Sequence, residues 1–383
     1  MLEQAGNITR NDIKRNNLLR VYNLLRREGT LSLQDISARL QLSLPTVSKN
    51  IAALESRTLA VSCDVKKNTG GRNSRLYEAV GNVHVAVGVN ITAHHISAVV
   101  INLRGEIIVQ HRQREVFERS EAYNKKVGAL VADMVDRSGV SPEQVLGVAL
   151  VLPALISKDG QHTYYTGVLG AEPVIDCGEF ARHIPYPTRF CHDGKAATYA
   201  ESWFNQDVTD FFYLMISESI IGTPSVGGRP YIGQNQRSGE IGHVRMVKDG
   251  RRCYCGKRGC TETYCSTKVL SSLTDGNLAE FFSLLEAGED RAVRLWQEYL
   301  GNLVVAINTA RMLFDCNIVI GGYLGQYMDP YMDQLHELAL AEDPFCEEID
   351  YISVCKYKTE ACATGGALMY LDEFVQTVSE GEE

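Results

Sequence analysis

The hydrophobic pattern of the first eighty residues predicts three helices in close succession. Apolar side chains recur at helical spacing from 13 to 25, and Gly29 stands where that helix would end. Ser32 and Ser43 each precede a further apolar-periodic segment, as N-cap residues do. Pro45 falls in the first turn of the last segment, where its missing N–H costs nothing. The second and third helices are therefore expected to be joined by a tight turn.

Two strand-like segments, 59–65 and 74–80, follow these helices and enclose a basic, glycine-rich tip, which is the pattern of a wing. A short helix, a tight turn, a helix with a polar face and a wing together predict a winged helix-turn-helix that reads DNA. The alternative is a small helical interaction domain with a solvated, charged hairpin. The residues expected to contact DNA are, on the third helix, Thr46, Ser48, Lys49 and Asn50, and, in the wing, Lys66, Lys67, Arg72 and Arg75.

Beyond residue 81 the pattern changes to that of an α/β body. Three strand-like segments lie between 85 and 110, buried strands then alternate with helices, and the same broad plan follows again after 211. Such a repeat predicts a duplicated α/β body whose ligand lies between the halves, at the carboxyl ends of strands. We therefore expect two domains, a DNA-binding domain at 1–80 and a ligand-sensing and oligomerisation body at 81–383.

The distribution of charge favours the same division. The 383-residue chain has a net charge of −9, but residues 1–80 contain 13 Lys and Arg against 7 Asp and Glu, whereas the remainder contains 25 against 40. A basic front on an acidic body indicates that the front meets a polyanion. No segment approaches the roughly 20 apolar residues of a membrane span. No leader-like apolar run stands at the N-terminus, so we expect a cytoplasmic, reducing location.

One histidine and three cysteines stand close together in the second half of the body. They are His243, Cys253, Cys255 and Cys260. One imidazole and three thiolates make a closed tetrahedral set of the kind that structural zinc takes, and glycines among the cysteines let the chain turn tightly. The alternatives are ordinary buried cysteines and a disulfide, although the odd total of 11 cysteines argues against a complete disulfide framework. Glu240 and Glu262 flank the cluster, which therefore predicts a metal site that shapes a pocket for a polar small molecule.

With these residues in view, the chain resembles the ROK family, which groups sugar-responsive repressors with sugar kinases. The resemblance lies in Gly239-Glu240-Ile241-Gly242-His243, in Cys253-Tyr254-Cys255-Gly256, in Gly259-Cys260-Thr261-Glu262 and in the wing tip Gly70-Gly71-Arg72. It implies an α/β fold with a two-lobed, actin-like (ribonuclease H-like) sugar-kinase body, and zinc held by His243, Cys253, Cys255 and Cys260. It also implies a sugar site made by His192, Asp193, Glu240, His243 and Glu262, with Asp193 at the position of the kinase base and His192 in place of the usual Asn.

Two segments depart from the pattern of the family's kinases. Residues 90–94 read Asn-Ile-Thr-Ala-His where a kinase has an Asp-x-Gly-Gly-Thr phosphate loop, and 217–221 read Ser-Glu-Ser-Ile-Ile in place of Gly-Thr-Gly-x-Gly. Glycines allow backbone N–H groups to reach phosphate oxygens, so their loss predicts a body without catalysis, in which Asp193 is a vestigial base.

The resulting prediction is a transcriptional regulator, by default a repressor, of carbohydrate genes, with a sugar or sugar phosphate as its effector. As a homodimer or homotetramer it would bind operator DNA with an inverted repeat, and structural Zn²⁺ would be its cofactor. The main alternative is an ATP-dependent sugar kinase with an added DNA-binding domain. A third interpretation is a body that only dimerises.

Overall fold

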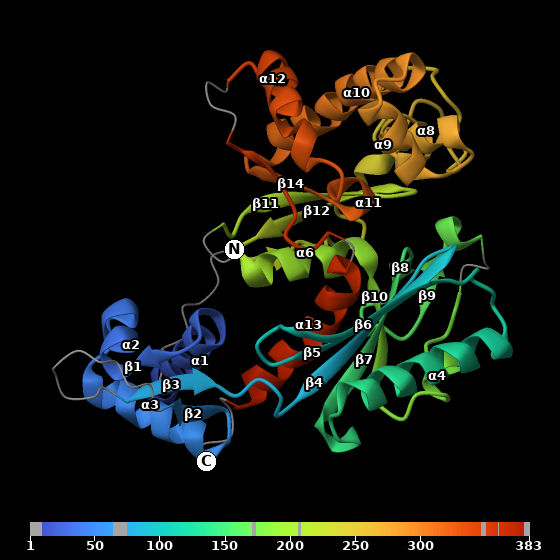
Figure 1. Ribbon diagram of the computed structural model, residues 1–383. Coiled ribbons are helices and arrows are strands. Elements are labelled where there is room, and N and C mark those ends of the chain that lie inside the picture. Colours follow the sequence, from blue (N-terminus) through green and yellow to red (C-terminus); the bar gives the residue numbers. More distant parts are fainter. Residues whose placement is uncertain are drawn as a thin grey trace.

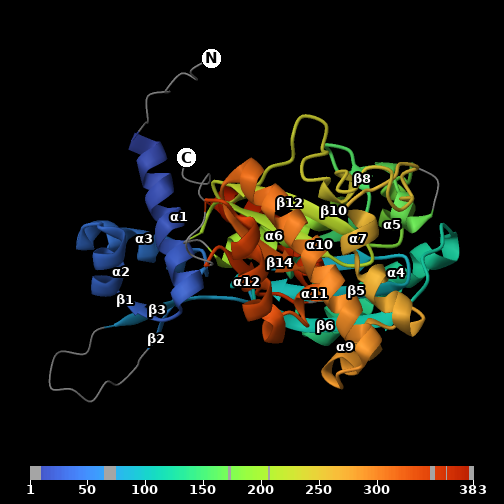
Figure 2. The ribbon, with the colours of Figure 1, turned by 90° about the horizontal axis from the view of Figure 1, so that it is seen from above.

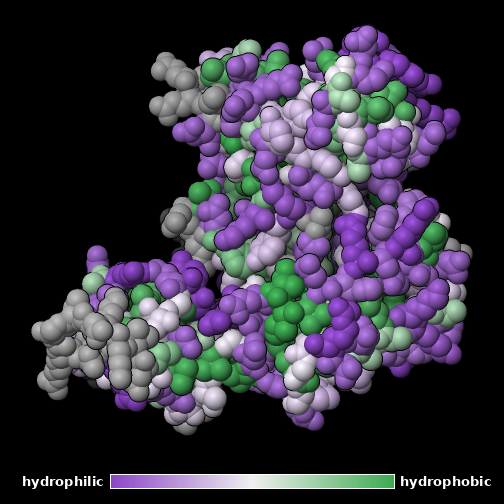
Figure 3. Space-filling model, viewed as in Figure 1, coloured by the Kyte–Doolittle hydropathy of each residue, from purple (hydrophilic) through white to green (hydrophobic). Residues whose placement is uncertain are grey.

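The computed structural model describes residues 10–63, 75–170, 174–205, 208–345, 350–358 and 360–378, and its N-terminal part is a small helical unit with a three-stranded sheet (Figure 1). This unit stands out to one side of the body when the molecule is seen from above (Figure 2). In the space-filling view, hydrophilic residues cover most of the visible face of the molecule (Figure 3). The sheet has the order β1-β3-β2 with antiparallel pairings. The elements are α1 (Arg10–Glu28), β1 (Leu31–Ser32), α2 (Leu33–Leu40), α3 (Leu44–Ser56), β2 (Ala60–Cys63) and β3 (Leu76–Ala79).

Two serine caps set the turn between α2 and α3, as the sequence predicted. The Ser32 hydroxyl accepts the N–H of Asp35 at 3.1 Å, and the Asp35 carboxylate accepts the N–H of Ser32 at 3.0 Å, which completes a capping box. Gln41 takes a left-handed conformation with φ 54° and ends α2. The Ser43 hydroxyl then accepts the N–H of Thr46 at 3.4 Å at the start of α3. The helix-turn-helix is thus fixed by local hydrogen bonds.

The first lobe of the body is built on a five-stranded sheet with the order β10-β7-β4-β5-β6. The pairs β4–β5 and β5–β6 are antiparallel, whereas β4–β7 and β7–β10 are parallel. Alternate residues of β4 pack against opposite faces of the sheet, because β-strand side chains alternate. The strands are β4 (Val85–Ile91), β5 (His95–Asn102), β6 (Ile107–Arg114), β7 (Val145–Leu152) and β10 (Thr188–His192).

The second lobe repeats this plan. Its sheet has the order β13-β12-β11-β14-β15, with β12 antiparallel to both neighbours and β14 parallel to both of its own. When the strands of each lobe are numbered in chain order, the two sheets have the same strand order and the same parallel and antiparallel pairs. The predicted duplication of the α/β body is therefore confirmed. The strands are β11 (Phe211–Ile216), β12 (Ile220–Val226), β13 (Arg229–Pro230), β14 (Asn317–Gly321) and β15 (Ile352–Val354).

Further helices and short strands cover these sheets. Among the described residues, no helix combines the length and the apolar composition that a membrane span requires. The remaining elements of the body are α4 (Glu121–Ser138), β8 (Leu155–Ile156), β9 (Thr163–Tyr165), α5 (Gly178–Ala181), α6 (Asp193–Phe204), α7 (Glu262–Cys265), α8 (Thr267–Ser271), α9 (Leu278–Glu286), α10 (Asp290–Phe314), α11 (Gly322–Gly325), α12 (Met332–Glu342) and α13 (Ala361–Val378), together with the 3-10 turns Pro142–Gln144, Gly167–Leu169, Ile241–His243, Ser272–Thr274 and Asp329–Tyr331.

Helices α6 and α13 lie between the two sheets and join the lobes through one apolar cluster. Helix α13 returns to the first lobe and continues toward the N-terminal unit (Figure 1, red). It packs so closely on β4 that a Cβ on Gly88 would lie 1.8 Å from the carbonyl oxygen of Ala363. Leu368 and Leu371 of α13 share a second apolar cluster with α1 of the N-terminal unit. The start of α6 contacts the segment that precedes the histidine and cysteines, because Lys195 donates to the side chain of Gln236.

Candidate functional site

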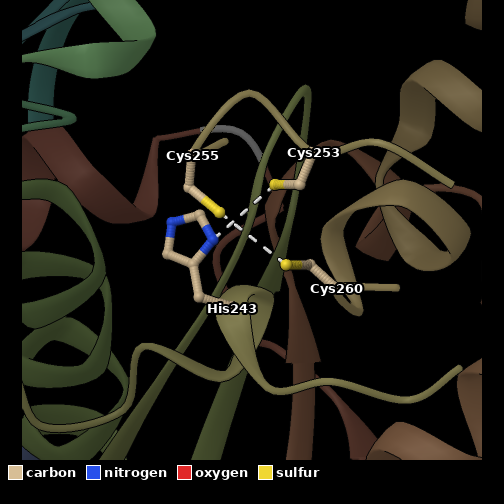
Figure 4. A group of neighbouring side chains, drawn as sticks. All are labelled: His243, Cys253, Cys255 and Cys260. Atoms are coloured by element: carbon tan, nitrogen blue, oxygen red, sulfur yellow. Dashed lines mark hydrogen bonds between the residues drawn. The ribbon is translucent and has the colours of Figure 1, made fainter. Parts of the chain in front are cut away.

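Four predicted ligand side chains converge in the second lobe (Figure 4). The sulfur atoms of Cys255 and Cys260 are 3.7 Å apart, and the sulfur of Cys253 is 3.8 Å from Nδ1 of His243. All four ligand atoms lie within 4.8 Å of one another. Zinc bonds of about 2.3 Å at tetrahedral angles place two sulfur atoms about 3.8 Å apart. The donor set and its spacing therefore fit a tetrahedral metal ion.

Two glycines shape the chain between the cysteines. Gly256 and Gly259 have φ of 85° and 78°, a region that residues with a side chain rarely adopt. Gly259 also passes so close to the backbone that a Cβ there would lie 1.6 Å from the carbonyl oxygen of Val247. Because glycine adopts this conformation without steric cost, Gly256 and Gly259 help to bring Cys253 and Cys260 into one place, where both are buried.

The two ring nitrogens of His243 face different partners. Nδ1 lies against Cys253, whereas Nε2 is 3.3 Å from the hydroxyl of Tyr254. Burial lowers the pKa of His243, so the ring is neutral near pH 7 and suited to a metal ion. Tyr254 was not predicted as a site residue, although it stands between two of the ligand cysteines.

Glu262 and Glu240 lie on either side of this cluster in the chain. Glu262 is buried at the start of α7, its Oε2 accepts the N–H of Ile220 at 2.9 Å, and burial raises its pKa to about 7. Burial also raises the pKa of Glu240, while the positive charges of Lys195 and Arg237 oppose that rise. In the described residues, no group hydrogen-bonds to the carboxylate of Glu240, so it has free acceptor capacity.

Asp193 and His192 form the junction of β10 and α6. The imidazole of His192 accepts the N–H of Gly194 through Nδ1 at 3.1 Å, which is the N-cap role that an Asn side chain also fills. Burial, followed by the charge of Lys195, lowers the pKa of His192 to about 3, so the ring is neutral. Asp193 accepts the same N–H at 2.7 Å; burial raises its pKa to about 7, and the charge of Glu240 adds to the shift.

The predicted sugar-contacting residues are thus drawn from both lobes. Asp193 of the first lobe and Glu240 of the second lie within each other's electrostatic field. Burial, followed by the charges of Glu262 and Glu240, raises the pKa of Tyr254. Burial also raises the pKa of Tyr165 of β9, and the charge of Glu240 adds to that rise. The hydroxyl of Tyr164 donates to the carbonyl of Asn235 at 3.0 Å across the lobes. The boundary between the lobes thus brings together buried carboxylates, tyrosines and a neutral histidine.

Lys195 is a further residue of this boundary that sequence reasoning missed. It follows Asp193 on the first turn of α6, is buried, and donates to the side-chain oxygen of Gln236 at 2.6 Å. The pattern gave no signal for this contact, because Lys195 and Gln236 are 41 positions apart.

The predicted DNA-contacting residues divide into three groups. On α3, Ser48 and Lys49 are exposed, whereas Thr46 and Asn50 are half-buried and the amide of Asn50 donates to the carbonyl of Thr46 at 3.0 Å. In the wing, Arg75 donates to the hydroxyl of Ser62 at 2.9 Å. The third group lies outside the described residues and comprises Lys66, Lys67 and Arg72.

The two segments that were predicted to stand in place of kinase phosphate loops make side-chain contacts of their own. The hydroxyl of Thr92 accepts the N–H of His95 at 3.0 Å, and that of Ser217 accepts the N–H of Tyr323 at 3.1 Å. Across the lobes, the guanidinium of Arg112 lies 4.4 Å from the ring centre of Tyr323. The buried Oδ1 of Asn90 has no hydrogen-bond partner within the described part of the chain.

Two surface hollows lie away from these residues. One of about 530 Å³ is bounded by β3 and by the turn between β5 and β6, and the other, of about 260 Å³, lies beside Tyr123 of α4. Neither is lined by any residue of the predicted site.

Comparison with known proteins identifies both parts of the chain. The ROK family profile matches residues 86–373, and a winged helix-turn-helix DNA-binding profile matches residues 14–57. The chain is similar to the DNA-binding transcriptional dual regulator NagC of Escherichia coli, at 25% identity over 281 residues, which are 71% of this chain and 68% of NagC. It is also similar to the xylose repressor of Caldicellulosiruptor bescii, at 23% identity over 264 residues, which are 68% of this chain and 66% of the repressor.

Solved structures agree with the fold. A ROK family transcriptional regulator, homologous to the E. coli MLC protein, superposes with a TM-score of 0.72 at 20% identity and covers 96% of this chain and 100% of its own. A ROK family glucokinase from Streptomyces griseus, in complex with glucose and AMPPNP, has a TM-score of 0.64 at 19% identity and covers 74% of this chain and 98% of its own. The winged helix-turn-helix and the two-lobed sugar-kinase-type body are therefore confirmed.

Proposed function

The chain belongs to the ROK family, and on this premise we propose that it is a DNA-binding transcriptional repressor that responds to a sugar or sugar phosphate bound between its lobes. The observation that carries the proposal is the coexistence of two parts in one packed unit. A winged helix-turn-helix exposes Ser48 and Lys49 on α3, and the same chain holds an interlobe cleft with buried carboxylates. Relatives named as a transcriptional regulator and a xylose repressor support this combination.

The sugar is recognised by acceptors and donors from both lobes. Asp193, Glu240 and Glu262 offer carboxylate oxygens to sugar hydroxyls. His192 and His243 offer Nε2, which in His243 lies beside the hydroxyl of Tyr254. Hydrogen bonds to charged groups are worth about 1.5–3 kcal/mol each, so a site of this kind discriminates strongly between ligands that fill it and those that do not.

The cluster at 243–260 holds structural zinc in this proposal. Its ligands are His243, Cys253, Cys255 and Cys260, and the ion supplies a fixed tetrahedral node rather than chemistry, because a closed four-ligand site has no open position. His243 thereby presents Nε2 and Tyr254 in a set orientation. The residues around the cluster then position Glu240 and Glu262.

The DNA-binding domain comprises residues 1–80, and the sensing and oligomerisation body comprises residues 81–383. Helix α3 enters the major groove with Thr46, Ser48, Lys49 and Asn50, and the wing with Lys66, Lys67, Arg72 and Arg75 binds phosphates or the minor groove. A homodimer or homotetramer presents such domains in symmetric pairs, so the operator is an inverted repeat. The protein acts in the cytoplasm.

Sugar phosphorylation is the second candidate function. It is favoured by Asp193, whose pKa of about 7 suits a group that takes a proton from a hydroxyl. Against it stand the departures of 90–94 and 217–221 from the phosphate-loop pattern of the family's kinases. Asn90 is neutral where a kinase has an acidic Mg²⁺ ligand, and Glu218 would place a negative charge beside bound phosphates. We therefore assign the cleft to sensing, with Asp193 as a ligand-binding residue.

A DNA selection followed by titration tests the proposal. Purified protein would be used to select duplexes from a random library, and the affinity for the enriched sequence would be measured by fluorescence anisotropy with and without each member of a sugar panel. We expect an inverted repeat and an at least fivefold change in affinity with one sugar. Failure to enrich any sequence, or sugar-dependent turnover of ATP in a coupled assay, would contradict the proposal.

A further inference from the structure

A buried ammonium group lies among the residues predicted to bind the sugar. Lys195 is 8% exposed and lies on the first turn of α6, next to Asp193 and within the field of Glu240. An ammonium group removed from water loses hydration that only a charged or strongly polar partner replaces. The partners of Lys195 therefore indicate whether its ammonium group has a structural role or binds a ligand.

The only hydrogen-bond partner of Lys195 in the described residues is Gln236. Its Nζ donates to the side-chain oxygen of Gln236 at 2.6 Å and approaches the carbonyl oxygen of the same residue at 3.4 Å. Both acceptors are neutral. Among the described residues, no carboxylate lies within 4.0 Å of this ammonium group, although surface lysines such as Lys126 and Lys358 do form such pairs. The most buried lysine of the cleft is thus paired with an amide.

The segment that carries Gln236 is not part of either sheet. Gln236 has φ of 60°, and Gly233 and Gly239 on either side of it also have positive φ. Gln236 itself is half-buried. Its side chain is consequently a partner that a stronger acceptor can replace, because Gln236 is only half-buried and lies in a segment outside both sheets.

A purely structural role would be to neutralise Glu240. That role predicts a direct pair between Lys195 and Glu240, since a charge-assisted hydrogen bond is stronger than one to a neutral amide. Although the two groups lie within each other's electrostatic field, Nζ points to Gln236 instead. The ammonium group of Lys195 therefore lies near the carboxylates that are predicted to bind the sugar, but it forms no ion pair with them.

We propose that Lys195 is an anion-binding residue of the effector site, and that the effector is a sugar carrying an anionic group, a carboxylate or a phosphate, which replaces Gln236 as the partner of Lys195. This inference rests on the proposed function, because it assigns the class of sugar to the same cleft. The carboxylates of Asp193, Glu240 and Glu262 then bind hydroxyls, and Lys195 reads the charge. When a neutral sugar binds, the ammonium group keeps its hydrogen bond to Gln236, so Lys195 adds nothing to the affinity for that sugar.

Matched pairs of sugars test the inference. Titration calorimetry on the full-length protein would compare glucose with glucose 6-phosphate and with glucuronate, and N-acetylglucosamine with its 6-phosphate. We expect the anionic member of at least one pair to bind at least tenfold more tightly than the neutral member. The phosphate and carboxylate arms separate the two sources of charge. Equal or tighter binding of every neutral member overturns the inference.

Variants of Lys195 connect the preference to the residue. Lys195→Met should remove the advantage of the anionic sugar by about tenfold or more and change neutral-sugar affinity less than threefold, whereas Lys195→Arg should retain most of it. Lys125→Met, on the exposed face of α4, is the control and should change neither. Thermal unfolding verifies that each variant is folded. Loss of both affinities to the same extent in Lys195→Met would show a structural role and overturn the inference.

The DNA measurement separates this inference from the proposed function. If a neutral sugar alone changes the affinity for the selected DNA, Lys195 does not read charge, yet the protein remains a sugar-responsive regulator. If no carbohydrate in the panel, neutral or anionic, changes that affinity, the proposed function fails and the inference fails with it. Support requires that the anionic sugar change the DNA affinity in wild type and lose at least most of that effect in Lys195→Met.

Discussion

Arg26 of α1 and Asp372 of α13 face each other across the junction between the N-terminal unit and the body, with Nη1 and Oδ1 3.6 Å apart. The guanidinium of Arg26, whose side chain is 3% exposed, lies 4.8 Å from the ring centre of Trp203 and donates to the carbonyl of Leu103. Asp372 accepts hydrogen bonds from Trp203 at 3.0 Å and from Tyr199, both on α6. One buried charge therefore ties the first helix of the chain to α6 and α13.

Removal of the acid should destabilise the junction. Asp372→Ala leaves Arg26 buried without its counter-charge, and breaking such a pair costs about 3 kcal/mol. We expect the free energy of unfolding from urea titration to fall by about that amount. Glu373→Ala is the matched control, because the neighbouring acid pairs with Arg189 at the surface, and surface pairs contribute about 1 kcal/mol or less. Equal effects of the two substitutions would show that the Arg26 contact does not stabilise the protein.

Loss of one cysteine ligand should release the metal ion. Cys255→Ser replaces a thiolate by a weak ligand, so we expect metal analysis to find one equivalent of zinc in the wild type and well below half an equivalent in the variant. The sugar response of DNA binding should be lost with it, because Glu240 and Glu262 flank the cluster. Cys316→Ser, outside the cluster, is the control. A variant that retains zinc and responds normally would refute the ligand assignment.

The buried carboxyl group of Asp193 should lower the stability of the folded protein as pH rises. Burial raises the pKa of Asp193 from 3.8 to about 7, so the unfolded chain releases this proton at a lower pH than the folded chain. The penalty is absent below pH 4, grows between pH 4 and 7, and is complete above pH 7. We expect Asp193→Asn to raise the free energy of unfolding by about 2 kcal/mol at pH 8 and by less at pH 5.

Denaturant titrations of wild type and variant at both pH values measure this difference. Asp133→Asn on α4 is the control, because Asp133 is exposed and forms an ion pair within its helix. A gain in stability that is the same at pH 5 and pH 8 would indicate a cause other than titration of Asp193.

The exposed lysine of α3 should contribute to DNA affinity without affecting the cleft. Lys49→Ala removes one cation from the face expected to meet DNA, so we expect affinity for the selected operator to fall by about five- to tenfold at 0.1 M salt. The dependence of log affinity on log salt should become shallower by about one. Sugar affinity measured by calorimetry should not change. Unaltered DNA affinity at matched salt would show that this face of α3 is not the reading surface.

Local signals in the sequence predicted much of this architecture. Serine caps, Gly29 and the apolar period define the helices of the N-terminal unit, because hydrogen bonds between near neighbours decide where helices start and stop. The short spacing between His243 and the cysteines likewise predicted their convergence, which is confirmed, while zinc itself stays a prediction. The general plan of the body followed from alternating strands and helices.

Strand β12 shows where this kind of reasoning fails. No strand was predicted at 220–226, a segment that contains Gly222 and Pro224, and both residue types are depleted in strands. The structure gives the reason for the glycine, since a Cβ on Gly222 would lie 2.2 Å from the ring of Phe212 on the neighbouring strand. The contacts of Lys195 with Gln236 and of Arg26 with Asp372 join distant segments, so no local pattern predicts them.

The position of α13 has a consequence for how the protein is made. Gly88, near the start of the body, packs directly under Ala363, so the first sheet lacks one of its two covering layers until residues 361–378 have left the ribosome. Leu368 and Leu371 on the same helix also complete the apolar contact with α1. A chain that lacks residues 361–378 therefore leaves that face of its first sheet without the α13 layer, and its first helix loses the apolar contact with the body.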